Sequence, residues 1–266
     1  MPDVYTHGHQ ESVLRSHTWR TAENSAGYLL PHLRSDLTLL DIGCGPGTIT
    51  LDLARRVAPG SVLGIDASAD VIRRAEAARV ETGVDNVRFT TGDVYALATD
   101  DAAFDVVHAH QVLQHLSDPV AALVELRRVL RADGLLAARD SDYASFTWAP
   151  ANPLLDRWNT LYHEVTARND ADADAGRHLL GWVRAAGFGD VTVSSSTWTF
   201  ADPDGRAWWG GLWADRCADS GFALQAVEYG FSDSAELGAI ADAWRAWAAE
   251  PDGFFMVPHV EILAHP

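Results

Sequence analysis

The stretch LLDIGCGPGT occupies residues 39–48 and decides the fold. It begins as a short apolar strand that ends in the acid Asp41, and it continues as a Gly-x-Gly-x-Gly turn made by Gly43, Gly45 and Gly47. Glycines let the backbone turn tightly, and they let a ligand approach main-chain atoms that a Cβ would block. A helical pattern follows the turn at once. This order of strand, turn and helix predicts the ligand-binding edge of an α/β sheet.

Short apolar runs alternate with helical patterns on the C-terminal side of this turn. Strands are predicted at residues 37–42, 62–66, 87–90, 104–108 and 135–139, with helices at residues 47–57, 69–81 and 118–130. Parallel strands need long connections that lie on the faces of the sheet, so this alternation predicts a doubly wound α/β fold. Ligands of such sheets bind at the carboxyl ends of the strands.

The alternation breaks after residue 139, and the remaining segments are more varied. We expect a loose arm at 1–17, helices at 18–30, 177–186 and 234–248, two or three helices in all within 203–249, and strands at 191–200 and 254–264. The polar and aromatic insert 141–175 ends in the Asp-rich run DADADAG. This run has no EF-hand register, so we interpret it as a solvated loop rather than an ion site.

Composition and charge restrict the partners. Of the 266 residues, 47% are hydrophobic and 21% are charged, which is typical of a folded globular protein. The net charge of −17 repels nucleic-acid phosphates and anionic membranes. Every basic residue is Arg, which excludes Schiff-base and P-loop lysine chemistry. Cys44 and Cys217 lack the spacing of a zinc site, and the chain begins without a signal-peptide pattern. We therefore expect a cytoplasmic protein without metal, nucleic acid or membrane partners.

Acids follow the first three predicted strands. Asp66, at the end of the second strand, is placed to accept two hydrogen bonds from a ribose diol. Asp93 follows the third strand and either accepts from an adenine amino group, with Val94 packed on the ring, or caps the next turn. Three features disfavour NAD as the ligand. Thr48 breaks the G-x-G-x-x-G spacing, Asp41 opposes a pyrophosphate but suits an α-ammonium group, and Asp93 adds a third acid after the third strand.

Together with TGDV at 91–94, FDVVH at 104–108 and RVLRADG at 128–134, these anchors resemble the class I S-adenosylmethionine-dependent methyltransferases in order and spacing. The resemblance implies a Rossmann-like seven-stranded sheet with an inserted α-helical cap, S-adenosylmethionine as cofactor and methyl transfer as the reaction. The cofactor-binding residues that it implies are Asp41, Gly43, Cys44, Gly45, Gly47, Asp66, Ala67, Gly92, Asp93, Val94 and His110.

A second resemblance lies nearer the N-terminus. The sequence RTAE at 20–23 is similar to a segment of glycine N-methyltransferase-like enzymes whose arginine holds the methionyl carboxylate, which implies that role for Arg20. A bidentate pair of arginine and carboxylate suits the task chemically. The central motifs also resemble the ubiquinone/menaquinone C-methyltransferases, but the N-terminal signature of those enzymes is missing. The sequence HAHQ at 108–111 replaces the Asn/Asp-Pro-Pro-Tyr/Phe motif of amino methyltransferases that act on nucleic acids or glutamine.

From these resemblances we expect one methyltransferase domain over residues 1–266. Its parts are an N-terminal arm and helix at 1–36, an S-adenosylmethionine-binding core at 37–140, and cap insertions at 141–175 and 201–250. The chain is expected to act as a monomer or a homodimer.

Several residues are candidates for a general base. His110 follows the fourth strand, where a histidine would lie beside the sulfonium. His115 lies a few residues further, where packing against the glycine-rich turn is the alternative role. Asp140, Asp142 and Tyr143 leave the fifth strand at the same edge, and their alternative is hydrogen bonding to loop backbone. A base is required only for a hydroxyl or carbon acid, since a free amine can attack first and lose its proton afterwards.

The tryptophans indicate the kind of acceptor. Nine of the ten lie beyond residue 147, and we expect at least half of these to serve packing alone. A cap rich in aromatic side chains over the strand ends favours a small aromatic or hydrophobic acceptor, such as a natural-product or quinone-like molecule. Two alternatives remain: a methyltransferase fold that binds the cofactor but acts as a cyclase or binding protein, and a nicotinamide-dependent oxidoreductase.

Overall fold

The structure is a computed structural model, and it describes residues 3, 5, 6 and 18–266. Apart from Asp3, Tyr5 and Thr6, the arm expected at residues 1–17 lies outside the described residues. None of the helices in the described part combines the length and the apolar character that crossing a bilayer requires.

A mixed sheet organises the described residues, in the order β3-β2-β1-β4-β5-β8-β6, with β7 paired to β8. Its strands are β1 (Leu39–Ile42), β2 (Val62–Asp66), β3 (Val87–Thr91), β4 (Phe104–His110), β5 (Leu130–Ser141), β6 (Thr147–Ala149), β7 (Gly189–Phe200) and β8 (Phe254–His265). The pairs among β1 to β5 are parallel, whereas β8 runs antiparallel to β5, β6 and β7. The predicted parallel, doubly wound core is confirmed.

The described residues hold eight strands rather than the seven expected. The extra strand is β6, which pairs with residues 254–256 of β8, while β5 pairs with residues 259–264 of β8. Strand β7 pairs along β8 from residue 255 to residue 265 and so occupies its other edge. Strand β6 therefore lies on the same edge of β8 as β5, beyond the end of β5. Its three residues are too few to show any periodicity in the sequence.

The helices are α2 (Ala22–Ser25), α3 (Thr48–Val57), α4 (Ala69–Thr82), α5 (Pro119–Val129), α6 (Pro153–Arg168), α7 (Ala175–Ala185), α8 (Pro203–Ala218), α9 (Gly221–Glu228) and α10 (Ser234–Ala249), with 3-10 turns η1 (Leu30–His32), η2 (Leu113–His115) and η3 (Tyr143–Ser145). The helix predicted over 18–30 is wrong in extent. A capping box between Thr21 and Asn24 begins α2 at Ala22, four residues later than expected, and the helix ends at Ser25.

Helix α6 was not expected inside the insert 141–175. Its N-cap is Asn152, Pro153 is its first residue, and apolar side chains spaced three or four residues apart form its buried face. Those buried apolar residues are Leu155, Trp158, Leu161, Tyr162 and Val165. The intervening polar residues obscured this periodicity.

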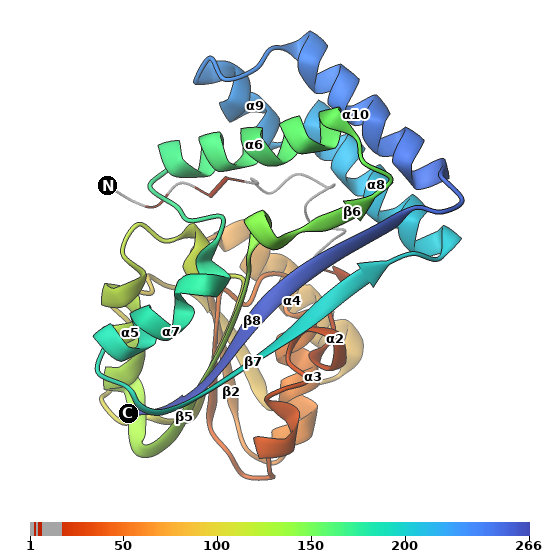
Figure 1. Cartoon of the computed structure of the whole chain (residues 1–266). Helices are drawn as coiled ribbons and strands as arrows, with labels where there is room; N and C mark the ends of the chain where they lie inside the picture. Colours follow the sequence, from red (N-terminus) through yellow and green to blue (C-terminus); the bar gives the residue numbers. More distant parts are fainter. Residues whose placement is uncertain (1–2, 4, 7–17) are drawn as a thin grey trace.

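Two helical layers cover the two faces of the sheet (Figure 1). Successive side chains of a strand point to opposite faces, so Leu39 packs with α3 and Leu40 with α5 and α7. Helices α6, α8, α9 and α10 form a separate cap that the long strands β7 and β8 reach (Figure 1). The core of this cap is aromatic: Trp158 packs edge-on against Trp213 and Trp244, with ring centroids 4.5 and 4.9 Å away.

Candidate active site

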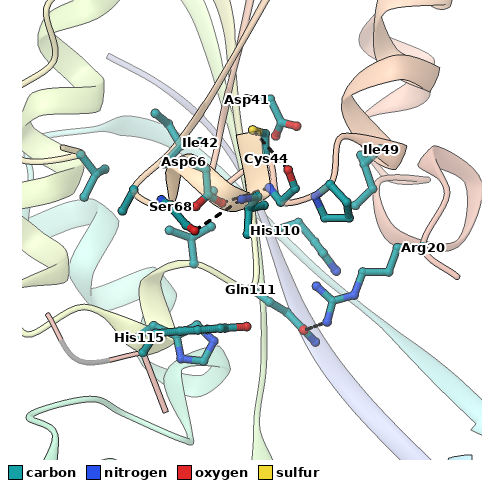
Figure 2. A pocket seen from close by; sticks show the side chains of 18 of the residues that line it. Arg20, Asp41, Ile42, Cys44, Ile49, Asp66, Ser68, His110, Gln111 and His115 are labelled. Atoms are coloured by element: carbon teal, nitrogen blue, oxygen red, sulfur yellow. Dashed lines mark hydrogen bonds between the residues drawn. The ribbon is translucent and has the colours of Figure 1, made fainter. Parts of the chain in front are cut away.

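A cavity of about 1010 Å³ lies between the carboxyl ends of β1 to β4 and the cap. Its sheet side carries the glycine-rich turn and the acids that end the strands, while Trp208, Trp209 and Arg216 of α8 line it from the cap side. A cavity this size lies at the upper end for small-molecule sites. Figure 2 shows Asp66 and Ser68 beside the turn, with His110 facing the same space.

Two positions of the glycine-rich turn require glycine, because each has a positive φ and each leaves no room for a Cβ. Gly43 has φ +63°, and a Cβ there would come within 2.4 Å of Val112 Cγ2. Gly47 has φ +86°, and a Cβ there would come within 2.9 Å of the Phe89 ring. Gly43 and Gly45 line the cavity, but Gly47 does not. Gly47 is the N-cap of α3 and packs closely against Phe89, so the structure gives it a local reason to be glycine, and its predicted cofactor contact stays a prediction.

Asp66 joins the second strand to the turn. Its Oδ2 accepts a hydrogen bond from the Gly45 amide at 3.1 Å, and its Oδ1 accepts one from the Ser68 amide at 2.9 Å. A carboxylate oxygen can accept two hydrogen bonds, so each oxygen retains a lone pair for a ligand in the cavity. Ala67 lines the same wall.

Asp93 caps the turn after β3 and also faces the cavity, so the adenine contact stays a prediction. Its Oδ1 accepts a hydrogen bond from the Tyr95 amide at 2.9 Å, which secures the turn after β3. The residue also lines the cavity together with Gly92 and Val94. A Cβ on Gly92 would come within 2.9 Å of Ile65, so the chain passes close to β2 here.

Asp41 is almost fully buried and already has two partners. Its Oδ2 accepts a hydrogen bond from the Thr50 hydroxyl at 2.5 Å, and its Oδ1 lies 2.7 Å from His108 Nδ1. Asp41 lines the cavity, as does its neighbour Cys44. Burial, with the charges of Asp41 and Asp66, raises the pKa of the Cys44 thiol well above its ordinary value, so the thiol stays protonated.

Arg20 reaches the cavity from the segment before α2. Its Nη2 donates to Gln111 Oε1 at 2.6 Å (Figure 2). Its guanidinium lies 5.6 Å from the centre of the Trp198 ring. Its Nε is buried and has no hydrogen-bond partner among the residues that the structure describes. Burial lowers the pKa of Arg20 to about 10, which leaves the group charged at neutral pH. An anion in the cavity would supply the missing partner.

His110 ends β4 inside the cavity. It is 5% exposed, and neither ring nitrogen has a hydrogen-bond partner within the described residues. Burial, with the charges of Arg139 and Arg20, holds the pKa of His110 well below its ordinary value. The ring is therefore neutral and can accept a hydrogen bond or a proton from a ligand.

His115 lies on η2 at the side of the cavity. Gln114 accepts from the Ser141 hydroxyl through Oε1 at 2.7 Å, so its Nε2 faces His115 Nε2 at 3.0 Å and donates to it. Burial, with the charges of Arg20 and Arg216, lowers the pKa of His115 to about 3. With Nε2 occupied, this histidine is oriented by its neighbours and poorly suited to collect a proton through that atom.

The structure separates the candidates that follow β5. Asp142 does not line the cavity: its carboxylate accepts from Arg177 Nε at 2.6 Å and Nη2 at 2.5 Å, and it caps η3 through the Ser145 amide at 3.1 Å. These contacts engage both carboxylate oxygens in holding η3 and α7, so the structure does not support the catalytic role predicted for Asp142. Asp140 is fully buried behind the cavity lining, and burial raises its pKa to about 8.

Tyr143 does line the cavity, where it stacks on Tyr162 with ring centroids 4.0 Å apart. Burial raises the pKa of Tyr143, so the phenol keeps its proton and offers a hydrogen-bond donor rather than a base.

Several cavity residues escaped prediction because they come from distant parts of the chain. The lining residues with aromatic or polar side chains that were not singled out include Tyr5, Gln111, Ser141, Phe146 and Arg216. Six of the nine tryptophans beyond residue 147 pack in or against a hydrophobic cluster and do not line the cavity, which fits the expectation of at least half: Trp148, Trp158, Trp182, Trp213, Trp244 and Trp247. No local pattern distinguishes the two groups.

Comparison with known proteins agrees with this geometry. A family model described as a methyltransferase domain matches residues 33–187. An uncharacterized methyltransferase of Schizosaccharomyces pombe is 34% identical, over 97% of this chain and 95% of its own length. Among solved structures, the YcgJ protein of Bacillus subtilis has a TM-score of 0.61 at 21% identity and covers 91% of this chain and 98% of its own. The [4+2]-cyclase SpnF has a TM-score of 0.57 at 24% identity and covers 100% of this chain and 88% of its own.

The two solved structures show the fold alone at these identities. The family model and the near full-length relative carry more weight, because they cover most of the sequence that forms the sheet, the glycine-rich turn and the cavity. The chain belongs to the class I S-adenosylmethionine-dependent methyltransferases.

Proposed function

We propose that this enzyme transfers the methyl group of S-adenosylmethionine to a small aromatic or hydrophobic acceptor. The observation that carries the proposal is that one cavity is lined both by the glycine-rich turn with its neighbouring acids and by aromatic side chains such as Trp208 and Trp209 of the cap. The cofactor supplies an electrophilic methyl group: the acceptor lone pair forms a bond to the methyl carbon while the carbon–sulfur bond breaks and sulfur keeps its electrons.

The sheet side of the cavity fits such a cofactor. Asp66 has a lone pair left on each carboxylate oxygen for a ribose diol. Asp93 and Val94 suit an adenine ring, with the amino group on the carboxylate and the ring face on the aliphatic side chain. The buried, unpartnered Nε of Arg20 suits the carboxylate of the amino-acid moiety. Asp41 and His110 line the same cavity as the glycine-rich turn, and a carboxylate or a neutral imidazole can accept a hydrogen bond from the cofactor's ammonium group.

The cap side fits an apolar acceptor. Trp198, Trp208, Trp209 and Phe146 present aromatic surface, and Tyr143 adds a neutral phenol that can donate to an acceptor oxygen. Such walls exclude water from the reacting atoms, so alignment and desolvation supply most of the rate enhancement.

His110 is the residue best suited to take a proton from a hydroxyl acceptor. It is neutral, faces the cavity and has both ring nitrogens available. Its lowered pKa makes it a weak base, so it assists only while the acceptor becomes acidic during methylation. An amine acceptor needs no such assistance.

The proposal is tested by incubating the protein with methyl-labelled S-adenosylmethionine and a panel of aromatic metabolites, with mass spectrometry of the products. A labelled product that depends on the protein supports methyl transfer, and its fragmentation identifies the methylated atom. The Asp66→Asn variant serves as the matched negative control. Binding of S-adenosylhomocysteine without any labelled product would favour the alternative of a cyclase or binding protein, and binding of a nicotinamide dinucleotide in its place would refute the proposal.

A further inference from the structure

Gln111 follows β4 directly and has an unusual backbone conformation. Its φ is +53°, in the left-handed region that side chains other than glycine seldom adopt. Its amide donates to the Arg139 carbonyl at 2.7 Å, and both chain neighbours, His110 and Val112, line the cavity. Strained backbone of this kind persists where the surroundings determine it, and it concentrates at functional sites.

The side-chain amide of Gln111 bridges two groups in one fixed orientation. Arg20 Nη2 donates to its Oε1 at 2.6 Å, and because a guanidinium can only donate, the amide nitrogen must face the other way. That nitrogen lies 2.8 Å from His259 Nε2. Burial, with the charges of Arg139 and Arg20, holds the pKa of His259 well below its ordinary value, so its ring is neutral and Nε2 accepts.

His259 is a firm anchor for this bridge. It is fully buried on β8, stacked near His110 at 6.1 Å between ring centroids and packed against Trp198 at 4.4 Å. Because Gln111 is hydrogen-bonded to His259 on β8, it can hold the long side chain of Arg20 in one place relative to the sheet. Figure 2 shows the Gln111 side chain extending to the Arg20 guanidinium at the edge of the cavity.

The environment of Arg20 favours the binding of an anion. No carboxylate among the described residues forms an ion pair with it, and the nearby charges that act on it include those of Arg139 and Arg216. Its Nε is buried, and nothing in the described part of the chain accepts a hydrogen bond from it. A charged guanidinium with an open donor, lining a cavity, binds a carboxylate strongly and with defined geometry.

We propose that Gln111 is a positioning residue that holds the Arg20 guanidinium, from the anchor His259, in the place where it receives the carboxylate of the cofactor's amino-acid moiety. This inference rests on the proposed function. It assigns Gln111 a part in selecting a nucleoside that carries an amino acid over the same nucleoside without one.

The test compares two ligands by calorimetry: S-adenosylhomocysteine, which carries the carboxylate, and 5′-methylthioadenosine, which lacks the amino-acid group. In Gln111→Leu, the Kd for S-adenosylhomocysteine should rise about tenfold, the effect of one hydrogen bond to a charged group, while that for 5′-methylthioadenosine changes less than about twofold. Gln225→Leu is the matched control, because Gln225 accepts from Asn169 in the cap and does not line the cavity. It should change neither Kd.

A double-mutant cycle adds a second readout. If Gln111 acts through Arg20, then Gln111→Leu should have no further effect in an Arg20→Met background. Equal weakening of both nucleosides, no weakening of either, or full additivity with Arg20→Met would overturn the proposal. Failure of the unaltered protein to bind S-adenosylhomocysteine would instead refute the proposed function.

Gln111→Glu keeps the test decisive should the leucine variant not fold. The glutamate has the reach of glutamine, so it still contacts Arg20, but its charge competes with the ligand carboxylate. We expect weaker binding of S-adenosylhomocysteine and unchanged binding of 5′-methylthioadenosine. Unchanged binding of both would contradict the inference.

Discussion

Replacement of Asp66 by Asn should weaken cofactor binding by an amount that follows from the geometry of its carboxylate. Both oxygens already accept a backbone amide, from Gly45 at 3.1 Å and Ser68 at 2.9 Å, and each can accept one more hydrogen bond. An asparagine keeps one acceptor oxygen but loses the charge and the second acceptor. A ribose diol bound by both oxygens would then lose one hydrogen bond to a charged group.

Such a hydrogen bond contributes about 1.5–3 kcal/mol, which corresponds to a rise of about 10- to 150-fold in Kd. The assay is calorimetric titration with S-adenosylhomocysteine, accompanied by thermal unfolding to verify that the turn remains folded. Asp70→Asn is the matched control, because Asp70 is exposed on α4, pairs with Arg73 and does not line the cavity. If Asp66→Asn folds and binds with unchanged affinity, the ribose is not held at the end of β2 and the reasoning fails.

Three further predictions concern stability. The pKa of Asp140, raised by burial to about 8, means that the folded state keeps a proton that the unfolded chain releases near pH 4. The unfolding free energy should therefore fall as pH rises from about 4 to 8, by up to about 1.4 kcal/mol per unit, and urea titrations of Asp140→Asn should lack that part of the slope. Gly43→Ala meets Val112 at 2.4 Å with φ +63° and should lose about 1–3 kcal/mol in thermal unfolding; an unchanged Tm would contradict this. Trp158→Ala, in the cap core, should lose about 3–5 kcal/mol yet still bind S-adenosylhomocysteine, whereas loss of binding in the folded variant would show that the cap core shapes the cofactor site.

The parallel part of the sheet was predictable because each of its signals is local. Apolar strands, the glycine-rich turn and the capped helices alternate within short distances along the chain, and β1 to β4 were located within two residues at either end. Strand β6 and helix α6 were not predicted, each for a reason of its own. Strand β6 is too short for periodicity, and the apolar positions of α6 are separated by charged and polar residues that exposed helix faces tolerate.

Some residues of the candidate site could be predicted from the sequence, and others could not. Asp66 and Asp93 were identified from their places at strand ends, and both line the cavity. Asp142 was chosen by the same rule, but Arg177, which is 35 residues later in the chain, binds its carboxylate. A strand end brings a side chain to the correct edge of the sheet. Whether that side chain faces the cavity depends on a partner that proximity in sequence does not reveal.

The sequence by itself determined the chemistry of the sheet side of the cavity. That side consists of the glycine-rich turn and the acids at the ends of β2 and β3, which the doubly wound sheet brings together. These features are encoded by neighbouring residues, since backbone conformation and strand periodicity are local properties. Only the tertiary structure decided how the opposite wall is built. Gln111 lies 91 residues from Arg20 and 148 residues from His259, so the bridge between them exists only after β4 and β8 have joined the same sheet. Burial then sets the charge states of those groups, because desolvation depends on what the folded chain packs around them.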